Sequence, residues 1–288
     1  MKKAVSLLCL ALVLATASLA LAADTLHFVI MSSEDPKAEG PKYTALAEYL
    51  KAGSPGIGEI ELRVAKDYPE AAKLFQSSEV DGMFSGSFLA GIFIKKEVAR
   101  PIARPVLANG ASTYKAVIIA KAGTKPFAGI GDFRGKKVAY TLLGSSGEVF
   151  VRGLLPAGEK PESVYTPVPA ASHMIAIKAV ESGAADYAVV KNMVWKPADF
   201  PGLALVGEDK GENPNNTLIM SNAAADKYGE EIKRHLLKLE SDSGALAMKV
   251  KEIFKIKGFI PTTNADFSHT FEIFEKAGIS AKTFDFKF

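Results

Sequence analysis

Residues 138–148 read V-A-Y-T-L-L-G-S-S-G-E. The apolar half predicts a β-strand, and the Gly/Ser run after it predicts a loop that leads into a helix. Such a loop presents backbone N–H groups and hydroxyls at the positive end of a helix dipole, where an oxyanion can bind. The candidate donors are Ser145, Ser146 and Gly147, and an ordinary capped helix start is the alternative. The run lacks the lysine and the spacing of a nucleotide P-loop, so the anion need not be a nucleotide.

Strand and helix patterns alternate along the rest of the chain. Strands are expected at 26–31, 59–65, 80–84, 115–120, 138–140, 163–168, 185–190 and 217–221. Helices are expected at 41–51, 68–77, 147–155, 172–182, 223–241, 243–255 and 268–277. Segments of these lengths in alternation predict parallel α/β units.

The length of the chain, 288 residues, favours two lobes over one. One lobe is expected to comprise 23–113 and 217–288 and the other 114–216, with crossovers near Thr113 and Asn216. Ligands of open α/β sheets bind beyond the carboxyl ends of the strands. Polar loops follow two predicted strands of the first lobe, one containing Ser33 and the other containing Ser85. We expect both loops to face the second lobe's Gly/Ser loop across a cleft.

The first 22 residues predict a signal peptide. Two lysines, Lys2 and Lys3, precede an apolar run at 5–14, and a small-x-small cleavage site occupies 20–22. An uncleaved membrane anchor is the alternative, but the apolar run is short for a spanning helix. We therefore expect export to the periplasm. Cys9, the only cysteine, lies inside this segment, so the mature chain would have no disulfide, thiolate nucleophile or Cys metal site.

The charge balance and the histidine positions exclude several classes of function. The formal net charge of +3 is too small for a nucleic-acid binder, and the chain has no basic stripe with interleaved aromatics. The four histidines do not have metal-ligand spacing, so we expect neither a metal nor another cofactor. His173 opens a predicted helix and could face a ligand, with a structural role as the alternative. Asp186 could accept a hydrogen bond from a protonated ligand oxygen or an amine, with an exposed loop position as the alternative.

Ser146, His173 and Asp186 also suggest a hydrolase. A nucleophile elbow has one glycine two residues before its serine and another two residues after it. Ser145 has a leucine two residues before it and Ser146 has a glutamate two residues after it, so each serine fails on one side. The chain order Ser, His, Asp also matches none of the common triads. We therefore do not expect an enzyme.

Five stretches have the order and spacing of a known family. They are SSEDP at 32–36, VDGMFSGS at 80–87, GSSG at 144–147, SH at 172–173 with VESGAAD at 180–186, and KGFIP at 257–261. Together they resemble the periplasmic phosphate/phosphite/phosphonate-binding proteins of ABC transporters, over nearly the whole mature chain.

The resemblance implies an α/β type II fold, two Rossmann-like lobes joined by two crossovers, with a small oxyanion bound between them. It implies that the loop at 144–147 donates to phosphoryl oxygens and that His173 adds a further hydrogen bond. Asp186 would accept from a protonated ligand oxygen or amine, and Tyr43 on the first helix is a looser candidate for an aromatic contact. The implied partner is a membrane permease, on which a closed monomer would dock without performing chemistry.

Three positions depart from the family's pattern. Gly144 replaces a serine, Ser85 replaces a tyrosine, and Met174 replaces an acidic residue that suits an ammonium group. These departures argue against an aminophosphonate and leave phosphite, phosphate, methylphosphonate or a different small anion open. The alternative function is a sensory module that delivers its closed form to a kinase or chemoreceptor, and a hydrolase using Ser146 or His173 is less favoured.

Overall fold

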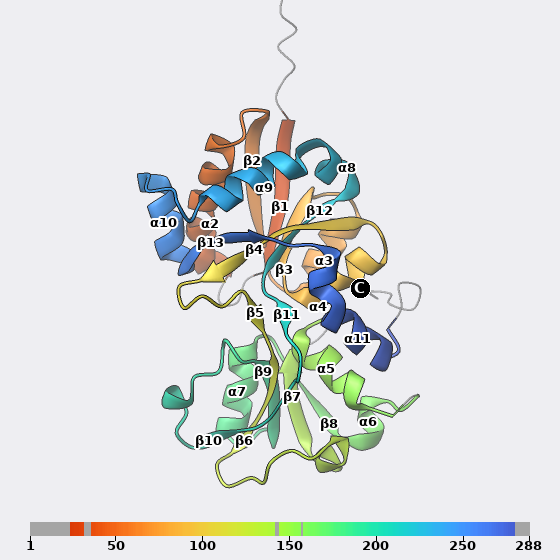
Figure 1. Ribbon diagram of the computed structural model, residues 1–288. Helices are drawn as coiled ribbons and strands as arrows, with labels where there is room; N and C mark the ends of the chain where they lie inside the picture. Colours follow the sequence, from red (N-terminus) through yellow and green to blue (C-terminus); the bar gives the residue numbers. More distant parts are fainter. Residues whose placement is uncertain (1–23, 32–35, 142–143, 157, 280–288) are drawn as a thin grey trace, which may run out of the picture.

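The computed structural model describes residues 24–31, 36–141, 144–156 and 158–279. Within these ranges the chain forms two lobes, each built around its own β-sheet, and two short strands cross between them (Figure 1). We call the upper lobe of Figure 1 lobe 1 and the lower one lobe 2. The two-lobed α/β fold predicted from the sequence is confirmed.

Lobe 1 contains a six-stranded mixed sheet with the order β13-β4-β12-β3-β1-β2. Its strands are β1 (Asp24–Met31), β2 (Ile57–Ala65), β3 (Gly82–Ser85), β4 (Ala99–Leu107), β12 (Thr217–Ser221) and β13 (Ile256–Pro261). The first three run parallel, as the alternation with helices predicts, whereas β12 runs antiparallel to both of its neighbours, β3 and β4. Its helices are α2 (Pro36–Ala52), α3 (Tyr68–Gln76), α4 (Ser87–Lys95), α8 (Asn222–Ala224), α9 (Glu230–Lys238) and α10 (Ala245–Phe254), with a π-helical turn η3 (Ala225–Gly229) between α8 and α9.

Lobe 2 contains a five-stranded sheet with the order β10-β6-β9-β7-β8. Its strands are β6 (Ala116–Lys121), β7 (Lys137–Thr141), β8 (Thr166–Ala170), β9 (Tyr187–Lys191) and β10 (Leu203–Glu208). The helical elements are η1 (Ile130–Phe133), α5 (Ser146–Leu154), α6 (Pro161–Val164), α7 (His173–Glu181) and η2 (Pro197–Asp199). Strands β7, β8 and β9 are parallel, so their carboxyl ends lie at one edge of the sheet.

One expected strand, 163–168, is wrong in its bounds. The structure has the helical turn α6 over 161–164 and places β8 at 166–170. Pro161 explains the turn, because proline fits the first position of a helix, where its missing N–H is not needed. The two prolines within β8 are tolerated because this strand lies at the edge of its sheet.

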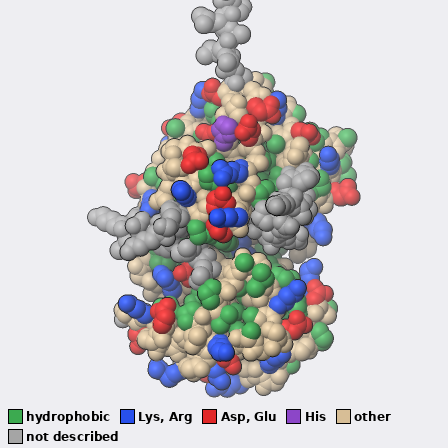
Figure 2. All heavy atoms as spheres, turned by 180° about the vertical axis from the view of Figure 1, so that it is seen from behind, with side chains coloured by type: hydrophobic (Ala, Val, Ile, Leu, Met, Phe, Trp, Pro, Cys, Tyr) green, Lys and Arg blue, Asp and Glu red, His purple; other side chains and the backbone are tan. Residues whose placement is uncertain are grey.

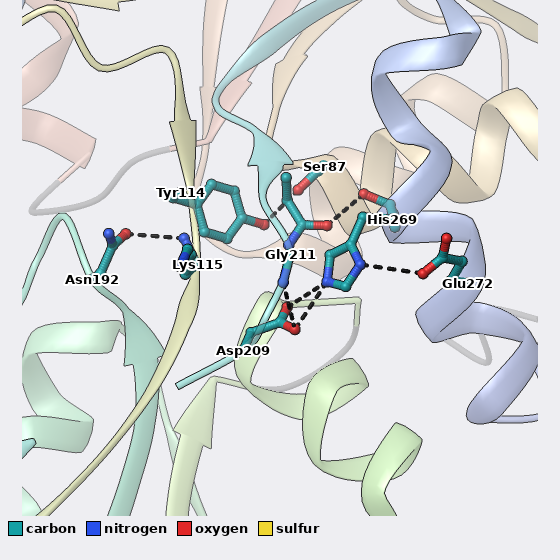
Figure 3. A network of polar contacts seen from close by, with 10 residues as sticks. Ser87, Tyr114, Lys115, Asn192, Asp209, Gly211, His269 and Glu272 are labelled. Carbon is teal, nitrogen blue, oxygen red and sulfur yellow. Dashed lines mark hydrogen bonds and ion pairs between the residues drawn. The ribbon is translucent and has the colours of Figure 1, made fainter. Parts of the chain in front are cut away.

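The crossovers are β5 (Thr113–Tyr114) and β11 (Asn213–Pro214), which pair with each other antiparallel. The last described helix is α11 (Ser268–Lys276), which follows the 3₁₀ turn η4 (Asn264–Phe267). One crossover is hydrogen-bonded to α11 and the other to α4 of lobe 1. Thr270 of α11 donates to the Asn213 side chain at 2.7 Å, and the Tyr114 hydroxyl is hydrogen-bonded to Ser87 at the start of α4. The crossovers are therefore held by α11 and α4, and Figure 3 shows the chain beside them bonded to lobe 2 as well, where the N–H of Lys115 donates to the Asn192 side chain at 3.1 Å.

A hydrophobic cluster runs across the boundary between the lobes. It joins α4 of lobe 1, α5 of lobe 2 and α11, and includes Phe88, Ile92, Val149, Phe150 and Phe274. The rings of Phe88 and Phe274 meet edge to face with their centroids 5.8 Å apart. Burial of each such side chain contributes about 1.5–3 kcal/mol, so this cluster holds the two lobes in the arrangement of Figure 1.

The surface shows no field of a single charge sign on the face drawn in Figure 2, where acidic and basic side chains are interspersed over both lobes. That pattern agrees with the small formal net charge of +3. Within the described residues, no helix combines the length and the apolar character needed to cross a membrane.

Candidate functional site

The Gly/Ser loop ends as the N-terminus of α5. Ser145 caps this helix, because its side chain accepts a hydrogen bond from the Glu148 N–H at 3.2 Å. The Ser145 hydroxyl in turn donates to the carbonyl of Thr141 at the end of β7. Both functions of this hydroxyl are therefore used inside the protein. Ser145 therefore acts as a helix cap, which the sequence analysis gave as the alternative to ligand binding. Its hydroxyl proton is not free for a ligand.

Ser146 differs from Ser145 in having a hydroxyl without a hydrogen bond. The residue is 2% exposed, and its Oγ atom is buried with no partner among the described residues. Burial raises the pKa of the nearby Tyr114 phenol, and Ser146 is one of the groups that oppose this rise, but its Oγ atom and the Tyr114 hydroxyl do not form a hydrogen bond of normal geometry. A buried unpaired hydroxyl is unfavourable by about 1–3 kcal/mol, and an anion that accepted from it would remove this cost.

The backbone structure explains why both glycines of the loop are glycine. A Cβ atom on Gly147 would lie 2.4 Å from the carbonyl oxygen of Val189, so only glycine allows α5 to lie this close to β9. Gly144 has a φ of +74°, the left-handed region that favours glycine. Its N–H donates at 2.9 Å to the carboxylate of Glu148, which also contacts Arg152 at 3.3 Å. The departure of Gly144 from the family's serine is thus explained by the backbone.

His173 is the first residue of α7, and Ser172 caps that helix. Its Nδ1 atom lies 3.4 Å from the Thr141 hydroxyl, which puts the imidazole at the same sheet edge as the Gly/Ser loop. Nε2 is buried and has no partner among the described residues. Burial, with a smaller effect from the charge of Lys191, lowers the pKa of His173 to about 3. The imidazole is therefore neutral near pH 7.

Lys191, which the sequence analysis did not select, ends β9 at this edge. The residue is 8% exposed, and its Nζ atom lies 3.4 Å from the Asn215 side-chain oxygen and 4.3 Å from the centre of the Tyr114 ring. Burial lowers the pKa of Lys191 to about 8. None of the carboxylates in the described part of the chain forms an ion pair with it. A buried ammonium compensated only by dipoles and a ring is a site for an anion.

The lobe 1 side of this site lies opposite Lys191. A Cβ atom on Gly86 would lie 3.4 Å from Lys191 Nζ and 3.6 Å from the Tyr68 hydroxyl. Burial raises the pKa of Tyr68 to about 12, so its hydroxyl stays protonated and can donate. Ser85, beside Gly86, donates to the Gly86 carbonyl at 3.2 Å and pairs in register with Thr217, whose Oγ1 atom is buried without a partner.

Four helix N-termini therefore meet at these contacts, which we call the lobe junction. They are the first residues of α3 and α4 from lobe 1 and of α5 and α7 from lobe 2: Tyr68, Ser87, Ser146 and His173. Each N-terminus carries a partial positive charge, to which Lys191 adds a full one. The unpaired hydroxyl of Ser146, Nε2 of His173 and the ammonium of Lys191 converge there from lobe 2. This arrangement favours an oxyanion held between the lobes.

The structure does not bring Asp186 to the lobe junction. Its carboxylate accepts from the N–H of Lys137, the first residue of β7, at 2.8 Å. Strand β9 starts next to it at Tyr187, which pairs with Val138 of the parallel strand β7. Asp186 thus lies at the amino edge of the sheet and Lys191 at the carboxyl edge. The ligand role that the family resemblance implied for Asp186, in a site shared with the 144–147 loop, is therefore not supported by its position at the amino end of β9.

Two other predicted site residues stay untested. Tyr43 is buried on α2, and its ring lies 5.3 Å from that of Phe254 in the core between α2 and α10. Ser33 lies outside the described residues. No three His, Asp or Glu side chains of the described ranges gather as a metal site would require.

A second polar network flanks the junction at the crossover side (Figure 3). His269 of α11 contacts both carboxylate oxygens of Asp209 through Nε2, at 2.9 and 2.8 Å, and lies 3.5 Å from Glu272 through Nδ1. Asp209 lies between β10 and β11, where the chain leaves lobe 2. The pair joins lobe 2 to α11 and leaves the carboxylate of Asp209 engaged away from Lys191.

Two lobes on separate sheets, two crossovers and an anion-favouring junction define a two-lobed solute-binding protein. The chain belongs to the family of periplasmic substrate-binding proteins of phosphonate ABC transporters, whose model matches residues 28–267. The family resemblance predicted from the sequence is confirmed. No curated protein sequence matches the chain at a significant level.

Solved structures show the same fold at low identity. XAC2383 from Xanthomonas citri, bound to chloride, superposes with a TM-score of 0.73 at 16% identity, covering 88% of this chain and 97% of its own. PhnD1 from Prochlorococcus marinus, in complex with methylphosphonate, has a TM-score of 0.71 at 16% identity, with 88% and 98% covered. A binding protein component of an ABC phosphonate transporter from Pseudomonas aeruginosa has a TM-score of 0.71 at 16% identity, with 88% and 87% covered.

Proposed function

We propose that this substrate-binding protein captures a small oxyanion of the phosphonate or phosphate class at the lobe junction, and that Lys191 is the principal anion contact. The buried ammonium of Lys191 carries the proposal, because it lies between the lobes with only neutral groups around it among the described residues. Ser146 and Nε2 of His173 would add hydrogen bonds from lobe 2.

The protein would act as a binding component without catalysis. Ser146 Oγ and His173 Nε2 each have no partner in the described part of the chain, so the imidazole is not hydrogen-bonded to the hydroxyl whose proton it would take. Asp186, which would complete a catalytic triad with Ser146 and His173, lies at the opposite edge of the sheet and cannot orient His173. The bound monomer would then dock on a membrane permease in the periplasm, after removal of residues 1–22.

Closure of the lobes around the ligand would give the site a high affinity. The junction draws donors from both lobes, so ligand and lobes close together, and exclusion of water strengthens each charge-assisted contact. The motion would be a hinge at β5 and β11, which α11 and α4 hold on the lobe 1 side.

Isothermal titration calorimetry of the mature protein with methylphosphonate, phosphate and phosphite tests this function. We expect one anion per chain, and we expect Lys191→Met to weaken binding by about 10- to 100-fold, the value of one charged hydrogen bond. Lys178→Met is the matched control, because this exposed lysine on α7 belongs to the same lobe. Unchanged affinity in Lys191→Met, or absence of heat with all three anions, would overturn the proposal.

A further inference from the structure

The surroundings of Lys191 also determine whether an anionic ligand can carry an additional positive charge. Groups from three other segments lie beside the Lys191 Nζ atom: the Tyr114 ring of β5, the Asn215 side chain after β11 and Gly86 before α4. A fourth group, His173 of α7, is near enough for the charge of Lys191 to lower its pKa. All four are neutral, since burial keeps the imidazole uncharged. The positive charge of Lys191 is thus opposed by no negative charge in the described part of the chain.

The unpaired hydrogen-bonding groups of the junction can each donate a proton. Lys191 Nζ can donate to a ligand, and within the described ranges the buried hydroxyls of Ser146 and Thr217 and Nε2 of His173 have no hydrogen-bond partner. The side-chain oxygen of Asn215 is an obligate acceptor, and Lys191 already uses it at 3.4 Å. A hydroxyl can donate or accept, and Nε2 of the neutral imidazole donates in the tautomer that leaves Nδ1 unprotonated, so an ionised oxygen can use each of these groups as a donor.

Three described carboxylates on the segments that form the junction are engaged elsewhere. Glu148 accepts from Gly144 N–H and contacts Arg152. Asp209 is paired with His269 of α11. Asp67 caps α3 by accepting from Glu70 N–H at 2.8 Å. None of these contacts directs a carboxylate to the Lys191 ammonium, so a cationic group of a ligand would meet Lys191 without a counter-charge.

We propose that Lys191 is a specificity-determining residue that restricts the site to ionised oxyanions without an ammonium group, and thereby excludes aminoalkylphosphonates. The inference rests on the proposed function, because it names the ligand class of the same site. An ammonium on the ligand would face the ammonium of Lys191 in a poorly solvated junction, where like charges repel strongly. A ligand oxygen that carries no proton is suited to the donors there.

Charge reversal at one position separates this selectivity from ligand size. Lys191→Glu would place a carboxylate among four helix N-termini and unpaired donors, which stabilise a negative charge. The variant is therefore expected to fold, and circular dichroism and thermal unfolding check this. Lys191→Gln, a neutral side chain of similar reach, is the intermediate control.

The probes are ethylphosphonate and 2-aminoethylphosphonate, which differ only in the amine, with methylphosphonate as the small reference, all measured by calorimetry at pH 7. We expect the wild-type protein to bind ethylphosphonate at least 100-fold more tightly than 2-aminoethylphosphonate, Lys191→Gln to reduce this ratio, and folded Lys191→Glu to bring it to 10 or below.

The outcomes distinguish the inference from the function on which it rests. Equal binding of the two ethyl compounds by the wild-type protein, or a ratio unchanged in folded Lys191→Glu, overturns the inference alone. Equal rejection of both when methylphosphonate binds also overturns it, because size and not charge would then select the ligand. Rejection of all three probes overturns the proposed function together with the inference. An unfolded Lys191→Glu leaves the ratio in Lys191→Gln as the deciding value, and no reduction there overturns the inference.

Discussion

Lys191 Nζ lies 4.3 Å from the centre of the Tyr114 ring, so a lobe 2 strand end is stacked on the crossover that joins the lobes. This contact links the charge of the site to the hinge. Tyr114 is 1% exposed, and its hydroxyl is hydrogen-bonded to Ser87 at the start of α4. One aromatic side chain therefore contacts the ammonium with its face and lobe 1 with its hydroxyl.

The face and the hydroxyl of Tyr114 can be separated by substitution. Tyr114→Phe keeps the ring over Lys191 and removes the bond to Ser87, so we expect a loss of about 1–3 kcal/mol in the free energy of unfolding with anion affinity within threefold of wild type. Tyr114→Leu removes the ring as well and should weaken methylphosphonate binding further, because Lys191 loses its cation–π contact. Denaturant unfolding and calorimetry measure the two effects. Equal affinities for the Phe and Leu variants would show that the ring does not hold the ammonium in place.

The buried ammonium makes stability depend on alkaline pH. The pKa of Lys191 is lowered from 10.5 to about 8, so between these values the unfolded chain binds the proton and the folded protein does not. The free energy of unfolding of the ligand-free protein should therefore rise through this window, by roughly 3 kcal/mol from this residue. Below pH 8 the destabilisation by Lys191 is fully present.

Urea unfolding of wild type and Lys191→Met between pH 7 and pH 11 isolates this contribution, because the other titrating groups are common to both proteins. We expect Lys191→Met to be the more stable protein at pH 7 and the difference to shrink towards pH 10.5. A difference that stays constant over the range would show that the ammonium is not buried in the ligand-free protein.

The close approach of α5 to its sheet predicts a sensitive glycine. Gly147→Ala would put a Cβ atom 2.4 Å from the carbonyl oxygen of Val189 and 2.9 Å from Cβ of Tyr140, so α5 must shift. We expect a loss of about 1–3 kcal/mol in the free energy of unfolding, the usual cost of overpacking, together with weaker anion binding. Gly131→Ala is the control, because nothing lies within 4 Å of that position. A Gly147→Ala protein as stable as Gly131→Ala would contradict the packing described.

Because Asp186 lies at the amino edge of the lobe 2 sheet, its substitution should leave anion binding unchanged. Asp186→Asn keeps an oxygen for the Lys137 N–H and is separated from the lobe junction by the length of β9. We expect its affinity for methylphosphonate, measured by calorimetry, to lie within twofold of wild type. A tenfold loss would return Asp186 to the binding site and contradict the strand register.

The fold was predictable from the sequence where periodicity was strong and misleading where proline interrupted it. The alternation of strands and helices predicted the two-lobed α/β fold. The lobe bounds near Thr113 and Asn216 stay a prediction, and the short strands β5 and β11 were not foreseen. Strand β4 was missed, because its two prolines at 101 and 105 argue against a strand, although its pairings with β12 and β13 contain register shifts that accommodate the irregularity. Strand β13 was taken only as a family motif, and the antiparallel return of β12 was not foreseen.

The sequence indicated which helix starts could form the candidate site, but it did not indicate Lys191. The helix starts at Ser146 and His173 were both found from capping patterns, and the structure puts them at the same edge. Lys191 was missed because a lysine at the end of an apolar run usually marks where a strand reaches solvent, and only tertiary packing shows that this one is buried. In the structure all five residues of β9, from Tyr187 to Lys191, are buried.

A crystal structure of the mature protein with methylphosphonate tests the central claim most directly. We predict the phosphonate group between the lobes, with one oxygen within hydrogen-bond distance of Lys191 Nζ and others near Ser146 Oγ and His173 Nε2. A phosphonate bound away from Lys191, or bound at the amino edge beside Asp186, would contradict the account.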